Sequence, residues 1–416
     1  MKILIVNKFL YPNGGSETYI FKLGEELKKR GHEVWYFGME HEGNIVGNDA
    51  GIYTSVMDFH SGGIKKLLYP FKIIYSREAY KKMYEIMQKF GPDIIHLNNI
   101  NFQLTPSVIH AARNWEKRSG KKVKIIFTAH DYQWVCPNHM LMVPSSGELC
   151  FKCEGGKFGA CTKNKCIHGS TLRSILGTME AGHYLKKKTY GMVDVIICPS
   201  EFLKKKLETY PLFKENAGKK TGRRPAIVMM HNFKYDHEEP SANGQAKAEN
   251  ASGKGNYVLY FGRYSEEKGV KTLLKVTDAL PGVSFKFAGN GPLKNMVEGR
   301  DNITEMGFLH GSELANTIKR AKLTVFPSEW YENCPFSVME SQIYQTPVLA
   351  SDIGGVSELL KDGVTGELFK AGDYRDLKAH LEGMLEDPDK LERYTKNCAD
   401  VHFDSVEEYT DRFLAL

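Results

Sequence analysis

The stretch that most constrains the fold runs from residue 323 to residue 358. Its residue pattern predicts, in order, a buried strand, a helix, a second strand and the start of a second helix, at 323–326, 337–344, 347–351 and from Gly354. Strands that alternate with helices favour a parallel sheet. The stretch therefore predicts an α/β protein.

Three glutamates come after these predicted strands: Glu332 in a loop, Glu340 in the helix, and Glu358 beyond Gly354-Gly355. In open α/β sheets, ligands bind beyond the carboxyl ends of the strands. Seven residues separate Glu332 from Glu340, so the two side chains can reach different parts of one elongated polar ligand. Taken singly, each glutamate is more typical of an acid near a helix start, where the helix dipole favours negative charge.

The chain has 416 residues, of which 42% are hydrophobic. That length suggests two or more domains with full cores. Strands and helices alternate on both sides of a polar linker, which predicts two Rossmann-like domains. We place the boundaries at 1–235, 236–255 for the linker and 256–400, and expect a helix at 401–416 that crosses back to the first domain.

Basic residues follow the first strand of the second domain. Arg263 and Lys268 lie in the turn between a predicted strand, residues 257–262, and the helix after Gly269. An arginine fork, a lysine charge and a helix N-terminus together suit a diphosphate.

The first domain starts with a strand, a glycine loop and a helix that we expect Ser16 to cap. The loop lacks G-x-G-x-x-G, so the dinucleotide fingerprint is absent. Gly14 and Gly15 would let backbone N–H groups approach an anion, although two glycines before a helix more often indicate only a tight turn. His130-Asp131 follows another strand, where both side chains can bond sugar hydroxyls. For His96, which ends an earlier strand, we favour a loop histidine whose hydrogen bonds are satisfied by the backbone.

These residues resemble those of the retaining glycosyltransferases of family 4, which have the GT-B fold and an E-x7-E signature. The resemblance covers nearly the whole chain and implies two Rossmann-like domains facing across a cleft, with a UDP- or GDP-sugar donor bound to the second. It implies catalytic or donor-binding roles for Gly14, Gly15, His130, Arg263, Lys268, Glu332, Phe336, Ser337, Glu340 and Glu358.

Within that set, the resemblance assigns Arg263 and Lys268 to the diphosphate, Glu332 to the donor sugar and Glu340 to the ribose. Where the family often has Gly-Phe-Gly, this chain has Pro335, which lacks a backbone donor. Sugar hydroxyls would then be met by the N–H groups of Phe336 and Ser337. Arg263 and Lys268 would stabilise the leaving group, so we expect no catalytic metal, and we identify no metal-binding Asp-x-Asp.

The implied reaction is hexosyl transfer to a glycan or lipid-linked saccharide in bacterial surface polysaccharide synthesis. Two other functions remain open. A non-catalytic sugar-nucleotide binder would keep Arg263, Lys268 and Glu340, and an epimerase of the same fold would not need a basic acceptor domain.

Residues 132–170 depart from the minimal family pattern. They contain Cys150, Cys153, Cys161 and Cys166, spaced C-x2-C-x7-C-x4-C. In a chain without a secretion signal, clustered cysteines favour metal over disulfides. Four thiolates would complete a structural zinc shell, and reduced thiols without metal are the equal alternative.

The net charge of +6 is uneven, because basic residues exceed acidic ones before residue 256 and the reverse holds after it. We find no signal peptide, and no apolar stretch long enough to span a bilayer. We therefore expect a cytoplasmic protein, with a basic first domain that binds an anionic membrane surface at the inner face of the cell membrane. No nucleic-acid motif accompanies the charge. The lysines proposed for membrane contact are Lys65, Lys66, Lys81, Lys82, Lys121 and Lys122.

Overall fold

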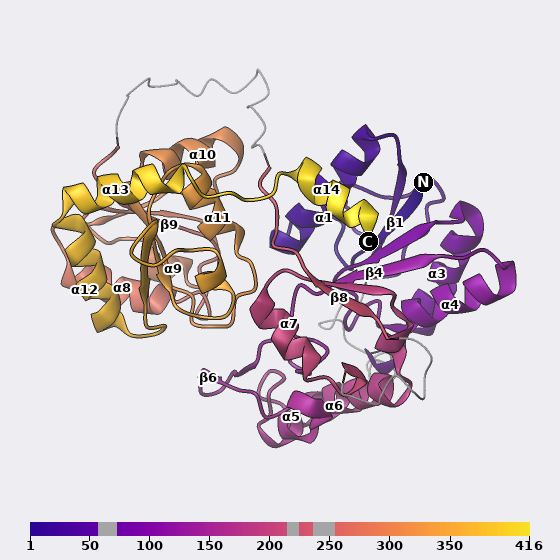
Figure 1. Cartoon of the computed structure of the whole chain (residues 1–416). Coiled ribbons are helices and arrows are strands. Elements are labelled where there is room, and N and C mark those ends of the chain that lie inside the picture. The colour runs from indigo at the N-terminus through magenta and orange to yellow at the C-terminus, as the bar shows by residue number, and fades with distance from the viewer. Residues whose placement is uncertain (57–72, 214–223, 236–253) are drawn as a thin grey trace. The chain divides into compact units, whose positions relative to one another are not determined.

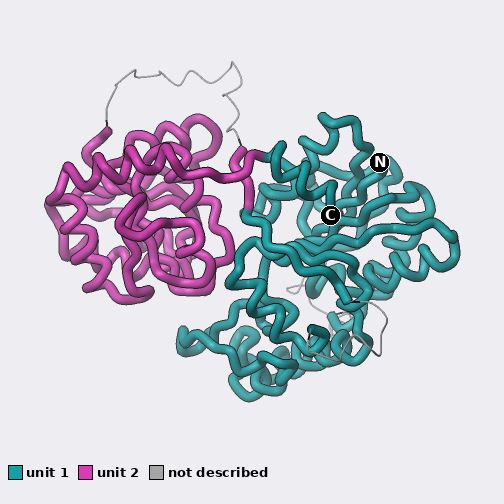
Figure 2. The backbone as a smooth tube through the Cα atoms, viewed as in Figure 1, with its two compact units in different colours: residues 1–231, 406–416 teal, residues 232–405 magenta. Residues whose placement is uncertain are grey.

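The computed structural model describes residues 1–56, 73–213, 224–235 and 254–416. They form two compact units (Figure 2), the first comprising residues 1–231 and 406–416 and the second residues 232–405. Most of the predicted linker lies outside the described residues. Each unit has its own six-stranded sheet, and all the pairings within the two sheets are parallel.

The sheet of the first unit has the order β2-β1-β3-β4-β7-β8. Its strands are β1 (Lys2–Val6), β2 (Glu33–Phe37), β3 (Ile94–Leu97), β4 (Lys124–Thr128), β7 (Val195–Cys198) and β8 (Ala226–Met229). The helices between them are α1 (Gly15–Lys29), α3 (Arg77–Phe90), α4 (Ser107–Ser119) and α7 (Glu201–Glu208) (Figure 1). Strands β3 and β7 are buried along their whole length, as expected of a parallel sheet covered on both faces.

The segment between β4 and β7 is longer than a single crossover helix. It contains a small hairpin and two helices: β5 (Met142–Val143), β6 (Glu148–Leu149), α5 (Gly159–Lys163) and α6 (Thr171–Lys186). Trp134 anchors the start of this segment, because its fully buried ring stacks on Tyr190 with centroids 4.1 Å apart. The predicted insertion is thus packed onto the first unit.

The last helix, α14 (Val406–Ala415), belongs to the first unit. It packs beside α1 and buries Tyr409 and Phe413. The hydroxyl of Tyr409 lies 2.8 Å from that of Tyr19, and Asp411 forms an ion pair with Arg30. One hydrophobic face and two polar contacts therefore fix this helix to the N-terminal sheet.

The second unit has the strand order β11-β10-β9-β12-β13-β14. These strands are β9 (Val258–Phe261), β10 (Phe285–Ala288), β11 (Ile303–Glu305), β12 (Leu323–Phe326), β13 (Val348–Ser351) and β14 (Gly366–Phe369). The helices are α8 (Val270–Ala279), α9 (Lys294–Val297), α10 (Gly311–Arg320), α11 (Phe336–Ile343), α12 (Tyr374–Leu385) and α13 (Pro388–Cys398). Numbered within the unit, this is the order 3-2-1-4-5-6 of the Rossmann fold.

Both strand orders reverse direction at one point, between β1 and β3 in the first unit and between β9 and β12 in the second. A crevice for ligands forms outside the strand ends at such a switch point. The predicted α/β class with two parallel sheets is confirmed. The prediction that Ser16 caps α1 is wrong, because the N-cap residue is Gly14. The Ser16 hydroxyl instead accepts a hydrogen bond from Asn99.

Candidate active site

The switch point of the second unit carries the predicted diphosphate residues. Arg263 and Lys268 follow β9, and Glu332 follows its neighbour β12. Gly269 closes the β9 turn with φ of +69°, and a Cβ there would lie 1.7 Å from the carbonyl oxygen of Pro327. Only glycine lets the two loops approach this closely, and that approach brings Lys268 to Glu332.

Glu332 is the centre of a hydrogen-bond network. It is buried, with 6% of its surface exposed. Its Oε1 accepts from Lys268 Nζ at 2.5 Å, from Trp330 Nε1 at 2.7 Å and from Ser328 Oγ at 2.8 Å. Three donors on one oxygen fix the direction of the carboxylate, and two of them, Trp330 and Ser328, did not emerge from the sequence analysis.

A second glycine fixes the backbone of Glu332. Gly354 has φ of +62°, and a Cβ at this position would lie 2.2 Å from the carbonyl oxygen of Glu332. The next residue, Gly355, donates its N–H to the same oxygen at 2.7 Å. The Gly354-Gly355 pair thus joins the loop after β13 to the loop after β12. Glu358 follows in the 3₁₀ helix η6 (Val356–Glu358) and is half-buried.

The two basic residues differ in their surroundings. Lys268 is paired with Glu332 and lies 5.2 Å from the centre of the Trp330 ring. Arg263 is exposed, and among the described residues its guanidinium has no hydrogen bond or ion pair. An exposed guanidinium beside a helix start remains accessible to an anion. The structure therefore brings Lys268 and Glu332 together and leaves Arg263 open to solvent.

Helix α11 holds the remaining donor-side residues. Phe336 and Ser337 lie in its first turn, where backbone N–H groups have no acceptor within the helix. Glu340 is buried one turn further and accepts a hydrogen bond from the hydroxyl of Tyr235 at 3.0 Å. The Tyr235 ring lies 5.7 Å from that of Phe336. Tyr235 is a neighbour of Glu340 that no sequence pattern indicated.

Asn232 contacts the loop that leads into α11 through both its backbone and its side chain. Its backbone N–H and its side-chain Nδ2 contact the sulfur and the carbonyl oxygen of Cys334, at 3.1 and 2.7 Å. These bonds hold the residue before Pro335 in place. The residues Asp387-Pro388-Asp389 have the Asp-x-Asp spacing, but the Asp387 side chain accepts from Lys390 N and caps α13.

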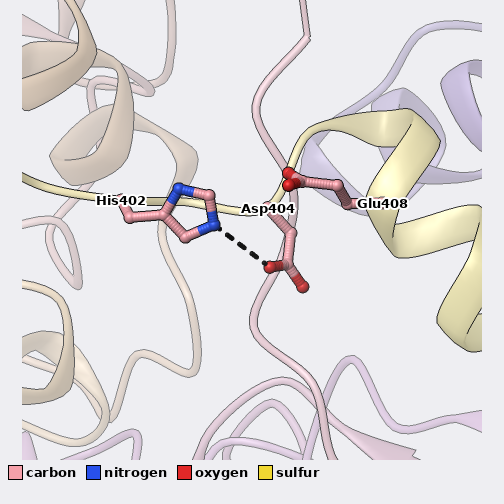
Figure 3. A group of neighbouring side chains, drawn as sticks. All are labelled: His402, Asp404 and Glu408. Carbon is pink, nitrogen blue, oxygen red and sulfur yellow. Dashed lines mark ion pairs between the residues drawn. The ribbon is translucent and has the colours of Figure 1, made fainter.

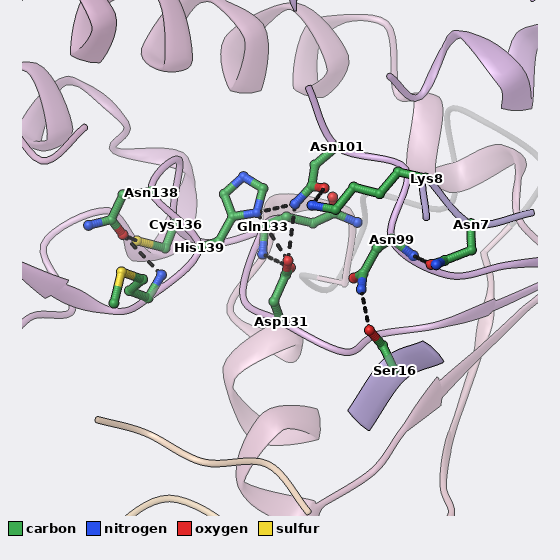
Figure 4. Close-up of polar contacts among 11 residues, drawn as sticks. Asn7, Lys8, Ser16, Asn99, Asn101, Asp131, Gln133, Cys136, Asn138 and His139 are labelled. Atoms are coloured by element: carbon green, nitrogen blue, oxygen red, sulfur yellow. Dashed lines mark hydrogen bonds and ion pairs between the residues drawn. The ribbon is translucent and has the colours of Figure 1, made fainter. Parts of the chain in front are cut away.

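The first unit gathers polar residues at its own switch point, after β1, β3 and β4 (Figure 4). Lys8 Nζ donates to Asn101 Oδ1 at 3.0 Å, and Asn101 Nδ2 donates to Asp131 Oδ2 at 3.1 Å. The same carboxylate oxygen lies 3.1 Å from His139 Nδ1. Its partner Oδ1 accepts the N–H of Gln133 at 2.8 Å. We call Lys8, Asn101, Asp131 and His139 the polar cluster.

Two members of the polar cluster have perturbed pKa values. Burial lowers the pKa of Lys8, against the opposing charges of Asp131 and Glu17. Burial would raise the pKa of Asp131, but His139, the Gln133 N–H and Lys8 outweigh it and keep that pKa below its usual value. Asp131 is therefore a carboxylate at neutral pH.

The backbone at the polar cluster is unusual. Phe102 and His139 both have positive φ, +59° and +68°, and their rings stack with centroids 4.8 Å apart. Non-glycine residues adopt this conformation at a cost that the surroundings must offset, and they concentrate at functional sites. Sequence analysis missed Lys8, Asn101 and His139 because they come from three segments far apart in the chain.

His130 is half-buried beside the polar cluster. Its Nε2 donates to Asn98 Oδ1 at 2.9 Å, and burial lowers its pKa to about 4. The imidazole is therefore neutral at physiological pH and able to bond a hydroxyl. His96 is fully buried, lies 2.8 Å from Thr128 Oγ1, and has a pKa of about 3, again because of burial. The expectation of a loop histidine satisfied by backbone is wrong, because His96 lies inside β3 and its ring contacts a side-chain hydroxyl.

The glycine loop of the first unit leads into α1, where Ser16 accepts a hydrogen bond from Asn99 of the loop after β3. Gly14 and Gly15 are exposed at the start of α1. Below them, Glu17 is buried and accepts a hydrogen bond from Asn7 Nδ2 at 2.9 Å. Burial raises the pKa of Glu17, while hydrogen bonds from Asn7 and Ser16 and the charge of Lys8 oppose the shift.

All eight cysteines are free thiols. Burial raises the pKa of Cys153 to about 12. Across the described residues, the cysteines form no group of three whose sulfur atoms lie within 4.8 Å of one another. Because zinc–sulfur bonds are about 2.3 Å long, a zinc shell would require the thiols of Cys150, Cys153, Cys161 and Cys166 to draw closer. Zinc binding stays a prediction.

The second unit ends in a further polar pair. His402 Nε2 lies 3.7 Å from Asp404 Oδ1 just before α14 (Figure 3). The histidine is 68% exposed. Exposed pairs of this kind contribute little to stability, and this one lies outside the strand-end sites.

Two parallel-sheet units, each with polar residues at its switch point, define the class of protein as one with the GT-B fold. The sequence model described as "Glycosyltransferase Family 4" matches residues 13–217, and the one described as "Glycosyl transferases group 1" matches residues 243–400. The chain belongs to the family 4 glycosyltransferases.

Relatives agree with that placement. Alpha-D-kanosaminyltransferase from Streptomyces kanamyceticus is 31% identical over 153 residues, which are 34% of this chain and 39% of that protein. The match to sulfoquinovosyl transferase SQD2 from Arabidopsis thaliana covers 28% of that protein. The chain thus spans less than half of either relative. An uncharacterized 42.6 kDa protein of the cps region of Klebsiella pneumoniae is 24% identical over 395 residues. The match covers 91% of this chain and 91% of that protein.

Solved structures share the fold. Sucrose-phosphate synthase from Thermosynechococcus elongatus has a TM-score of 0.66 at 16% identity, with 100% of this chain and 98% of that chain covered. Anabaena HepE in complex with UDP-glucose has a TM-score of 0.61 at 14% identity, with 100% and 99% covered.

Proposed function

We propose that this protein is a retaining hexosyltransferase that uses a nucleotide-diphosphate sugar as donor. The observation that carries the proposal is the Lys268–Glu332 pair at the switch point of a Rossmann-type unit. Family membership and the UDP-glucose bound to HepE support the donor class.

In the proposed reaction, the bond between the anomeric carbon and the diphosphate oxygen breaks, and a bond to the acceptor oxygen forms. The diphosphate leaves with the bonding electrons, and the acceptor hydroxyl proton passes to the departing phosphate. Arg263 and Lys268 offset the charge that develops on the leaving group, a form of electrostatic stabilisation that dominates many enzymes. The first-turn N–H groups of α11 would add to it.

Glu332 would orient Lys268 and bond a donor-sugar hydroxyl through the oxygen that faces away from the three donors. Glu340, joined to Tyr235, would hold the ribose. The remaining donor-binding residues would be Phe336, Ser337 and Glu358. This assignment gives each carboxylate a different part of the donor, as the seven-residue spacing suggested.

On the acceptor side, we propose that the polar cluster and His130 hold the hydroxyl that receives the sugar. Asp131 is an ionised acceptor of hydrogen bonds, and His130 is neutral and can donate or accept. Gly14 and Gly15 would approach the donor diphosphate from the start of α1. His139 comes from residues 132–170, so this segment would help select the acceptor.

The acceptor that we propose is a glycan or a lipid-linked saccharide of surface polysaccharide synthesis. The cps-region relative, which matches along 91% of its length, supports this choice. In the described residues, we find no helix with the length and apolar character needed to cross a bilayer. We propose that the protein reaches a lipid-linked acceptor by peripheral contact with the inner face of the membrane.

A panel of UDP- and GDP-sugars, incubated with the protein without acceptor, tests the donor proposal. We expect slow release of free sugar and nucleotide from one donor, because water can replace the acceptor. Interconversion of sugar epimers would instead favour an epimerase. Binding of a nucleotide sugar without either reaction would favour a non-catalytic binder.

A further inference from the structure

Helix α6 carries an apolar stripe on its exposed face. Leu172, Ile175 and Met179 are 66%, 38% and 54% exposed. Their spacing of three and four residues places them on the same side of the helix. Scattered apolar residues are normal on protein surfaces, but a contiguous set marks an interaction site. We call these three residues the α6 stripe.

The other face of α6 is already occupied. Ser174, Gly177, Glu180 and Tyr184 are buried. Gly177 packs so closely that a Cβ there would lie 2.4 Å from the Ile167 side chain, and Thr178 Oγ1 contacts Thr162 of α5 at 2.9 Å. Helix α5 lies alongside α6 (Figure 1). Because packing with α5 and the insertion uses this face, the α6 stripe points away from them.

The sequence around α6 is strongly basic. Between residues 150 and 188 there are only two acids, Glu154 and Glu180. Glu154 pairs with Lys206 at 2.9 Å, and Glu180 is buried. Neither carboxylate offsets the exposed cations of this stretch. These are Lys152, Lys157, Lys163, Lys165, Arg173, Lys186, Lys187 and Lys188.

We propose that the α6 stripe and these cations dock the protein on an anionic lipid surface. Apolar side chains would enter the headgroup boundary, while lysines and Arg173 would remain at the phosphates, as in helices that lie in the membrane plane. A second copy of the chain is a poorer occupant, because it would bring two basic surfaces together. The inference deepens the proposed lipid-linked acceptor.

This surface differs from the one expected from sequence. Lys65 and Lys66 lie outside the described residues. Lys82 pairs with Glu85 at 3.6 Å, and Lys121 pairs with Asp93 at 2.7 Å. Cations that already have acidic partners attract a membrane less than unpaired ones. Lys81 and Lys122 are exposed, but α3 and the loop after α4 carry no exposed large hydrophobic residue among the described residues, so we place the docking surface at α6.

Co-sedimentation with vesicles tests the inference without donor or acceptor, so its result is independent of the transferase assay. The vesicles contain phosphatidylglycerol with phosphatidylcholine, or phosphatidylcholine alone. We expect binding to the anionic vesicles at low salt, weakened when salt shortens the Debye length to about 10 Å or less. The L172Q/I175Q/M179Q variant should bind at least about tenfold more weakly, since each apolar side chain loses its transfer energy.

Two control variants locate the surface. Phe308 is 74% exposed in the second unit, so Phe308→Gln should bind like the wild type. The K121Q/K122Q variant should also retain binding, whereas K186Q/K187Q/K188Q should lose about tenfold or more, at roughly 1 kcal/mol per cation. Circular dichroism would verify that the variants are folded.

Four outcomes would overturn the inference. These are wild-type protein that stays in the supernatant, equal binding to neutral vesicles, an L172Q/I175Q/M179Q variant that sediments like the wild type, and reversible dimerisation without lipid that this variant abolishes. The last result would assign the α6 stripe to a second copy of the chain. Donor hydrolysis that persists in a variant unable to bind vesicles would leave the proposed function intact.

Discussion

Trp330→Phe tests whether the network around Glu332 acts in catalysis. The change removes one N–H donor, 2.7 Å from Glu332 Oε1, and keeps an aromatic ring near Lys268. A hydrogen bond to a charged group contributes about 1.5–3 kcal/mol, which corresponds to roughly a ten- to hundredfold loss of kcat/KM. Nucleotide affinity should change little, because Glu332 is assigned to the sugar and not to the nucleotide.

The assay is nucleotide release from the donor that the panel identifies, with calorimetry of the free nucleotide alongside. Ser328→Ala removes a second donor to the same oxygen and serves as the matched variant. If both act through Glu332, each should have little further effect in a Glu332→Gln background, since coupled residues are not additive. Unchanged kcat/KM in Trp330→Phe, or an equal loss in both backgrounds, would refute the reasoning.

Three other changes follow from the structure. Glu340→Gln should weaken nucleotide binding more than turnover, measured by calorimetry and initial rates, and the reverse pattern would exclude the ribose role. Burial raises the pKa of Glu180 to about 8 from 4.5, so the folded state retains a proton that the unfolded state loses, and stability falls as pH rises from 4.5 to 8. Glu180→Gln should remove that fall in urea unfolding curves, by up to ~1.4 kcal/mol per pH unit; curves that keep the wild-type pH dependence would contradict the assignment. Metal analysis of protein purified without chelator should give about one zinc per chain, whereas metal-free protein with titratable Cys150, Cys153, Cys161 and Cys166 would show that the thiols are unliganded.

Much of the fold could be predicted because its signals are local. The apolar runs at 258–261, 323–326 and 348–351 are buried strands, and Gly269 and Gly354 mark turns that other residues could not make. Lys268 and Glu332 could be predicted for the same reason, because each residue follows a strand that its local sequence indicates. Strand order, in contrast, depends on pairing between distant segments, which periodicity does not encode.

The unpredicted parts of the site depend on contacts between distant segments. Tyr235 reaches Glu340 across 105 positions of sequence, and Lys8 reaches Asn101 across 93. His139 comes from the insertion, in which the cysteine spacing is a recognisable sequence pattern and a single histidine is not. The strand at 366–369 was missed because Gly366 weakens the strand pattern.

Calorimetric titration of Lys268→Ala with UDP and GDP tests the central claim most directly, namely that the second unit binds a donor diphosphate through Lys268. The wild type should bind one of the two nucleotides, and the variant should bind it at least about tenfold more weakly, because a cation near the phosphates is lost. Lys271→Ala is the matched control, since Lys271 lies one turn away and pairs with the exposed Glu266; its affinity should equal that of the wild type. Equal affinity in Lys268→Ala and the wild type would contradict the account.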